Sequence, residues 1–154
     1  MEKVNYTLLK EQLESLFEGE TNVIALLSNA AAVLYHGICN INWAGFYLIE
    51  EGHLILGPFQ GKPACMHIPI GKGVCGTAVE KDETQLVEDV HKFPGHIACD
   101  SASRSEIVIP IHNKTGKIVG VLDIDSAEKS RFTQIDKAGL EEIVTVIAKY
   151  CFNG

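Results

Sequence analysis

Three cysteines in the middle of the chain stand beside glycines, where loops or the ends of elements are expected. Their sequence contexts are Gly57–Cys65, Gly71–Thr77 and Pro94–Asp100. A cysteine with a purely structural role behaves as a small hydrophobe and prefers the buried interior of an element. Three cysteines at loop positions therefore predict thiol–disulfide chemistry at Cys65, Cys75 and Cys99, with a thiolate as the reactive form.

Metal binding is the alternative use of these sulfurs, since the segments Cys65–His67 and His96–Cys99 contain soft ligands. The chain has no Cys-x-x-Cys motif, and it lacks the paired spacing of ordinary zinc sites. We therefore expect no metal site. The two remaining cysteines, Cys39 after the second helix and Cys151 in the last turn of the final one, are expected to be packing residues.

Carboxylates form a second group that could do chemistry. Asp123 and Asp125 end an apolar run, and residues two apart on a strand face the same side. Like charges at this spacing tend to raise one pKa, which supplies a proton donor. Glu106 begins the preceding strand, while Trp43 and Tyr47 share one face of another strand, as core residues or as the wall of an apolar pocket. These carboxyl groups matter for catalysis only if the fold brings them close to the cysteines.

The composition fits one globular domain. The chain has 154 residues, of which 46% are apolar and 21% charged, and its formal net charge is −7. No run of Lys or Arg is present, which argues against nucleic acid as a partner. The N-terminus lacks the apolar stretch of a signal peptide, and no apolar run is long enough to span a bilayer. We therefore expect a cytoplasmic protein without a membrane partner, whose cysteines are reduced at rest.

Hydrophobic periodicity predicts the elements that must position these side chains. Helical spacing predicts a helix over residues 7–18, a second one capped by Thr21 and ending at Gly37, and a terminal helix over 133–150. A short helix is predicted at 74–80 and a long loop at 91–105, a length that is usually functional. The predicted strands span 41–49, 53–59, 66–70, 84–90, 106–112 and 117–125.

This order of elements predicts an α/β protein of the α+β type. Hairpin links dominate, so we expect one domain over residues 1–154 with a central antiparallel sheet and helices packed on it.

At these residues the chain resembles the free methionine-(R)-sulfoxide reductases, which are built on a single GAF domain. The matching segments are Asn42–Tyr47, Gly57–Cys65, Gly71–Thr77, Pro94–Asp100, Ser105–Val108 and Gly120–Asp125. Three cysteines in these contexts are specific to this family, because GAF domains that only sense ligands generally lack them.

The resemblance implies a GAF fold, a homodimer without a cofactor, and reduction of the R epimer of free methionine sulfoxide. It assigns the attack on the sulfoxide to Cys99 and the main resolving role to Cys65, and it leaves the role of Cys75 open. It also implies that an acidic group and an aromatic wall bind the substrate. These substrate-binding residues are Glu106, Asp123, Asp125, Trp43 and Tyr47.

In the implied reaction Cys99 becomes a sulfenic acid, which condenses with a second cysteine to a disulfide that thioredoxin reduces. Three other functions stay open at this point. A GAF sensor would bind a small ligand without turnover, a thiol redox switch would act on a protein partner, and a zinc module would contain metal.

Overall fold

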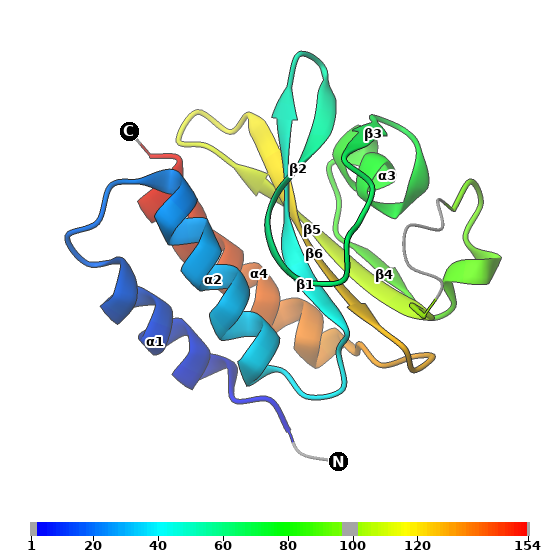
Figure 1. Ribbon diagram of the computed structural model, residues 1–154, viewed down its shortest axis with the longest axis horizontal. Helices are drawn as coiled ribbons and strands as arrows, with labels where there is room; N and C mark the ends of the chain where they lie inside the picture. Colours follow the sequence, from blue (N-terminus) through cyan, green and yellow to red (C-terminus); the bar gives the residue numbers. More distant parts are fainter. Residues whose placement is uncertain (1–2, 97–101, 154) are drawn as a thin grey trace.

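The computed structural model describes residues 3–96 and 102–153 (Figure 1). The helices in this part are α1 (Tyr6–Phe17), α2 (Val23–Gly37), α3 (Gly73–Lys81) and α4 (Gln134–Cys151), with a short 3-10 helix at Val90–Lys92. The strands are β1 (Trp43–Glu50), β2 (His53–Gly61), β3 (His67–Pro69), β4 (Gln85–Val87), β5 (Ser105–His112) and β6 (Ile118–Ser126).

The six strands form one sheet in the order β3-β2-β1-β6-β5-β4, and every neighbouring pair is antiparallel. Two hairpins join strands that follow each other in the chain, β1 with β2 and β5 with β6. The contact between β1 and β6 joins these hairpins across the middle of the sheet. The predicted antiparallel sheet with packed helices is thus confirmed.

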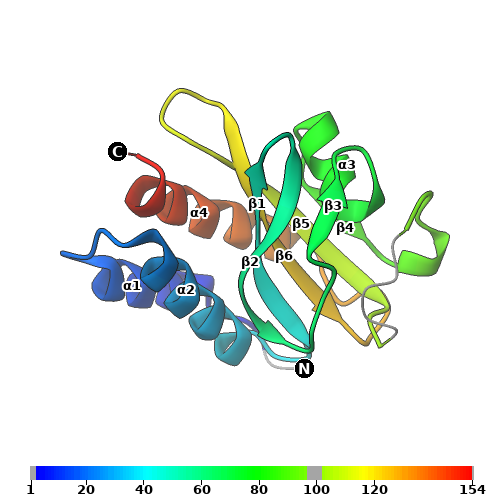
Figure 2. The same cartoon turned by 45° about the horizontal axis from the view of Figure 1, so that its top comes forward.

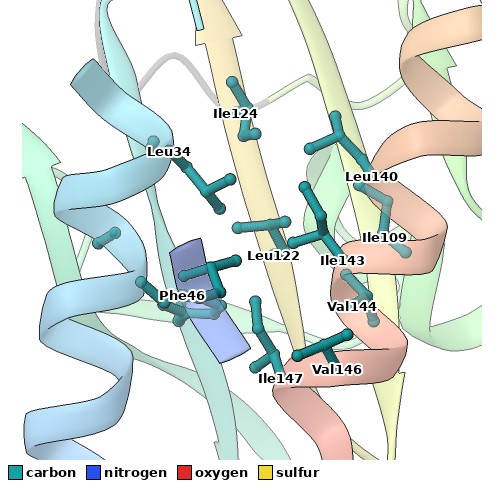
Figure 3. Close-up of a cluster of buried hydrophobic side chains, with 14 of the residues drawn as sticks. Leu34, Phe46, Ile109, Leu122, Ile124, Leu140, Ile143, Val144, Val146 and Ile147 are labelled. Carbon is teal, nitrogen blue, oxygen red and sulfur yellow. The ribbon is translucent and has the colours of Figure 1, made fainter. Parts of the chain in front are cut away.

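Helices cover one face of this sheet. Figure 1 shows α2 and α4 side by side on the sheet, with α1 packed outside them. Alternate residues of the central strands point into this layer and meet the apolar side chains of α2 and α4 (Figure 3). The labelled core residues are Leu34, Phe46, Ile109, Leu122, Ile124, Leu140, Ile143, Val144, Val146 and Ile147. Burial of this apolar layer is the main force that fixes the sheet against the helices.

The opposite face of the sheet carries a second, smaller core. Figure 2 shows α3 and β3 on this side, away from the three long helices. The side chains that alternate with the first core point here, among them Trp43, Tyr47, Val108 and Val121.

None of the helices within residues 3–96 and 102–153 combines the length and apolar composition that crossing a membrane requires.

Two local predictions were wrong. Asn22, not Thr21, caps α2, because the Asn22 side chain accepts a hydrogen bond from the backbone N–H of Ala25 at 3.0 Å. The strand predicted over 84–90 is only three residues long. The Asp89 carboxylate accepts from the backbone N–H of His91 at 3.1 Å, and this local bond turns the chain into the 3-10 helix.

Candidate functional site

A small pocket lies between the second face of the sheet and α3. Its volume is about 40 Å³, which is room for one or a few water molecules. Strands β1, β5 and β6 form its floor, and α3 together with the segments around residues 64 and 96 encloses it. The lining residues are Trp43, Tyr47, Ala64, Ile68, Gly73, Val74, Cys75, His96, Ser103, Glu106, Asp123 and Asp125.

Strand register brings the three carboxyl groups together. Glu106 on β5 lies directly opposite Asp125 on β6, and Asp123 is two residues away on the same face. All three residues are at least nine-tenths buried. The sequence predicted that Asp123 and Asp125 share a side, and the structure adds Glu106 to them.

Burial changes the acidity of these groups. The pKa of Glu106 is raised well above its ordinary value, first by loss of hydration and then by the charge of Asp123. The pKa of Asp123 is raised in the same way, by burial and then by the charge of Asp125. Among the described residues, no Lys or Arg lines the pocket to offset this negative charge. The pocket therefore favours a proton or a cation.

Two aromatic rings form the wall facing the carboxyl groups. The centroids of Trp43 and Tyr47 lie 6.0 Å apart with nearly parallel planes, and Phe59 stacks on Trp43 at 5.1 Å. Gly45 lies between them, and a Cβ atom there would collide with Phe59. The predicted sharing of one strand face by Trp43 and Tyr47 is confirmed, and the pair lines the pocket.

The polar ends of the same two rings hold the segment that carries Cys65. The indole Nε1 of Trp43 donates to the carbonyl of Lys62 at 3.0 Å, and the Tyr47 hydroxyl donates to the carbonyl of Cys65 at 2.9 Å. Gly61 turns the chain out of β2 with a φ of 134°, a conformation that favours glycine. Cys65 is disulfide-bonded. The aromatic wall thus positions this cysteine beside the pocket.

Cys75 lies in the first turn of α3 and points at the carboxyl cluster. Its Sγ donates to Oδ2 of Asp123 at 3.4 Å, and the side chain is a free thiol that is 4% exposed. Burial raises the pKa of this thiol well above its ordinary value, and the charge of Asp123 adds to the effect. At neutral pH the group is protonated and is a poor nucleophile.

The pocket contains one titratable residue, His96, that the sequence indicated only as an alternative metal ligand. His96 lines the pocket, and burial followed by the charge of His91 lowers its pKa. Its place in the segment that leads to Cys99 was the available signal.

The predicted nucleophile, Cys99, lies outside the described residues. The structure therefore brings together seven of the eight predicted site residues around one pocket: Trp43, Tyr47, Cys65, Cys75, Glu106, Asp123 and Asp125.

The carboxyl cluster predicts an unusual pH dependence of stability. Folding raises the pKa of Asp123 from its ordinary value of 3.8, so the folded state favours the protonated acid. The contribution of Asp123 to the free energy of unfolding is then most favourable below about pH 4. This contribution falls as the pH rises through the raised pKa of Asp123. Asp123→Asn removes this penalty, and we expect it to stabilise the reduced protein by about 1–2 kcal/mol at pH 8 and by less at pH 5.

Urea unfolding of the variant and the wild type at pH 8 and pH 5 measures the difference in their free energies of unfolding. Glu11→Gln, at an exposed position on α1, is the matched control and should leave the free energy of unfolding unchanged at both pH values. A lower free energy of unfolding for Asp123→Asn than for the wild type at pH 8 would contradict the assignment of a raised pKa to Asp123.

Comparison with known proteins agrees with this geometry. A family model described as GAF domain matches residues 21–149. The free methionine-R-sulfoxide reductase of Escherichia coli is 54% identical over 144 residues, which cover 94% of this chain and 87% of that protein. The reduced structure of the Staphylococcus aureus fRMsr has a TM-score of 0.93 at 59% identity, with 96% of each chain covered.

A third relative was solved with its substrate. This free methionine-R-sulfoxide reductase from Neisseria meningitidis has a TM-score of 0.90 at 44% identity, and the match covers 94% of this chain and 87% of that one. The identities far exceed what a shared fold alone requires, and the matches span nearly the whole chain. The chain therefore belongs to the GAF-domain family and, within it, to the group of the free methionine-R-sulfoxide reductases.

Proposed function

We propose that this protein reduces free L-methionine (R)-sulfoxide to L-methionine. The observation that carries the proposal is the buried pocket in which three carboxyl groups face an aromatic wall. A free amino acid offers an ammonium group to the carboxylates, while its thioether end suits the rings of Trp43 and Tyr47. The relatives named above carry the same activity in their names.

The pocket has to widen to admit this substrate. A volume of about 40 Å³ holds only a few water molecules, far less than methionine sulfoxide occupies. The enclosing segments around Ala64 and His96 are loops, whereas the sheet floor is fixed by strand pairing. Substrate binding is therefore proposed to displace these loops and to leave Glu106, Asp123 and Asp125 in place.

Cys99 is the proposed nucleophile. Its thiolate attacks the sulfoxide sulfur. The oxygen then passes from the substrate sulfur to the sulfur of Cys99, the S–O bond of the substrate breaks, and methionine leaves. One proton from a neighbouring acid completes the sulfenic acid on Cys99. The substrate is reduced by two electrons and Cys99 is oxidised by two. Glu106, whose pKa is raised by burial and by the charge of Asp123, is suited to donate a proton to the developing oxyanion.

Cys65 is proposed to resolve the sulfenic acid. Its thiol attacks the sulfur of the Cys99 sulfenic acid, a disulfide forms, and water carries away the oxygen. A dithiol protein, thioredoxin, then reduces the disulfide by exchange. The hydrogen bond of Tyr47 to the Cys65 carbonyl supports this role, because it holds Cys65 beside the substrate pocket. The buried, protonated Cys75 is less suited to exchange.

Turnover of each epimer of free methionine sulfoxide with thioredoxin, thioredoxin reductase and NADPH tests the function. We expect NADPH oxidation with the R epimer only. A sensor would bind without turnover, and a redox switch would form a disulfide with peroxide but leave both epimers unchanged. Either result would refute the proposal.

A cytoplasmic homodimer is the proposed form of the enzyme, with a role in repair after oxidative stress. Exposed apolar side chains on α1 and α2, which are Leu8, Leu16 and Ile24, offer a surface for self-association. Sedimentation of the reduced protein measures its oligomeric state, and a monomer at micromolar concentration would refute this part.

Cys65→Ser should separate the first turnover from the catalytic cycle. We expect one equivalent of methionine per chain at nearly the wild-type rate, because the attacking thiol is untouched. Steady-state turnover with thioredoxin should fall at least about tenfold, since the sulfenic acid then lacks its main partner. Single-turnover and steady-state assays measure the two values.

Mass spectrometry of the oxidised wild type provides the control. A disulfide between Cys65 and Cys99 is expected. Finding Cys75 paired with Cys99 instead would reassign the resolving role, and unchanged steady-state turnover in Cys65→Ser would do the same.

A further inference from the structure

Three potential metal ligands from different elements converge in the pocket. The sulfur of Cys75 on α3 and a carboxyl oxygen from each of Glu106 on β5 and Asp123 on β6 all lie within 4.8 Å of one another. All three residues are buried. We propose that the reduced protein binds one Zn²⁺ ion through Cys75, Glu106 and Asp123, and that this ion blocks the substrate pocket.

The geometry suits zinc. A tetrahedral ion with a Zn–S bond of about 2.3 Å and a Zn–O bond of about 2.0–2.2 Å holds its sulfur and oxygen ligands about 3.5 Å apart. The sulfur of Cys75 already lies 3.4 Å from Oδ2 of Asp123. A small movement of the Glu106 side chain completes a three-ligand site, and the pocket volume of about 40 Å³ leaves room for a water in the fourth position.

One carboxylate oxygen of Asp123 supports the binding of a cation at this place. Oδ1 of Asp123 is buried, and within the described part of the chain no N–H or hydroxyl group donates to it. The groups that interact with the Asp123 carboxyl group are the thiol of Cys75 and the carboxyl groups of Glu106 and Asp125, and each of these is itself a ligand type for a metal ion. A divalent ion would satisfy these acceptors together.

The ligand set selects the class of metal. A thiolate with carboxylates favours a soft or borderline ion such as Zn²⁺, whereas Mg²⁺ and Ca²⁺ require six or more oxygen ligands. The sequence lacks the paired cysteines of an ordinary zinc site, so no metal site was expected from it. The structure brings together ligands that are distant in the sequence. Glu106 lies 31 positions after Cys75, and Asp123 lies 17 positions after Glu106.

Zinc at this position would compete with substrate. The same carboxyl groups would no longer be free to bind an ammonium group, and Glu106 would lose its proton to the metal site. This consequence rests on the proposed function, whereas the metal binding itself does not.

Calorimetric titration of the reduced full-length chain with Zn²⁺, in the absence of substrate, tests the binding. We expect one equivalent per chain. Co²⁺ should bind at the same place and give a thiolate-to-metal charge-transfer band in the near ultraviolet. Cys75→Ser should abolish this band and weaken Zn²⁺ binding at least about tenfold, and Asp123→Asn should weaken it comparably. Cys39→Ser, at a cysteine outside the pocket, is the matched control and should bind as the wild type does.

Circular dichroism confirms that each variant is folded, and Glu106→Gln serves as a second ligand variant. Absence of Zn²⁺ binding to the wild type, or wild-type binding by Cys75→Ser, would overturn the proposal. In the activity assay, Zn²⁺ should raise the KM for the sulfoxide, and a chelator should reverse the effect. Zinc binding without inhibition would overturn the blocking role alone. A protein without reductase activity would leave the calorimetric result unaffected.

Discussion

Cys99→Ser is expected to abolish the formation of even one equivalent of methionine from free methionine (R)-sulfoxide. A serine hydroxyl is not ionised at neutral pH, and it cannot replace a thiolate as the nucleophile at sulfur. The first-turnover rate should therefore fall by at least about three orders of magnitude. The measurement is methionine released per chain, by chromatography, from pre-reduced protein without an external reductant.

Cys39→Ser is the control for this experiment, because Cys39 lies away from the pocket at the end of α2. It should release the same amount of methionine as the wild type. If Cys99→Ser still releases one equivalent, the attack belongs to another cysteine. The buried thiol of Cys75 would then be the next candidate, since it lines the pocket.

Blocking the amino group of the substrate is expected to lower kcat/KM by at least about two orders of magnitude. N-acetylation removes the positive charge that Glu106, Asp123 and Asp125 are proposed to bind, and it adds bulk that the enclosed pocket has to admit. Hydrogen bonds to charged groups are typically worth about 1.5–3 kcal/mol each, which is roughly a tenfold to hundredfold effect for each one lost. Sulfoxide-containing proteins, with peptide bonds on both sides of the residue, should be poor substrates for the same reason.

The comparison uses the R sulfoxides of free and N-acetylated methionine with the same enzyme preparation. Asp125→Asn provides the matched variant, because it removes one carboxylate while keeping the size of the side chain. It should lower kcat/KM for the free amino acid, so that the ratio of kcat/KM between the free and the N-acetylated substrate becomes smaller. Comparable rates on both substrates with the wild type would mean that the acidic group does not recognise the amino-acid head group.

Much of the fold could be read from local patterns. Helical periodicity located α1, α2 and α4 to within a few residues, and alternation with turn residues located both hairpins. Local hydrogen-bond competition decided the places where the prediction failed. Asn22 and Asp89 use their side chains to cap or turn the backbone, and several neighbouring polar residues could have done so equally well.

Local patterns also set the direction of the site's side chains. A period of two placed Asp123 and Asp125 on one side of β6, and Trp43 and Tyr47 on one side of β1. The residue types limited the chemistry to thiols, carboxylates and an aromatic wall, and the family resemblance gave each residue an expected role. These properties belong to the chain itself, because they depend only on residues within one strand or on the identity of single side chains.

Only the tertiary structure decided which of these groups meet. The register of β5 against β6 sets Glu106 opposite Asp125, and the packing of α3 on the same face sets the sulfur of Cys75 3.4 Å from Asp123. The hydrogen bond from Tyr47 to the Cys65 carbonyl likewise joins residues from separate segments. Sequence periodicity states which way a side chain points but not which strand lies beside it. The raised pKa values of Glu106, Asp123 and Cys75 and the proposed zinc site follow from burial and mutual distance, which are properties of the packed structure alone.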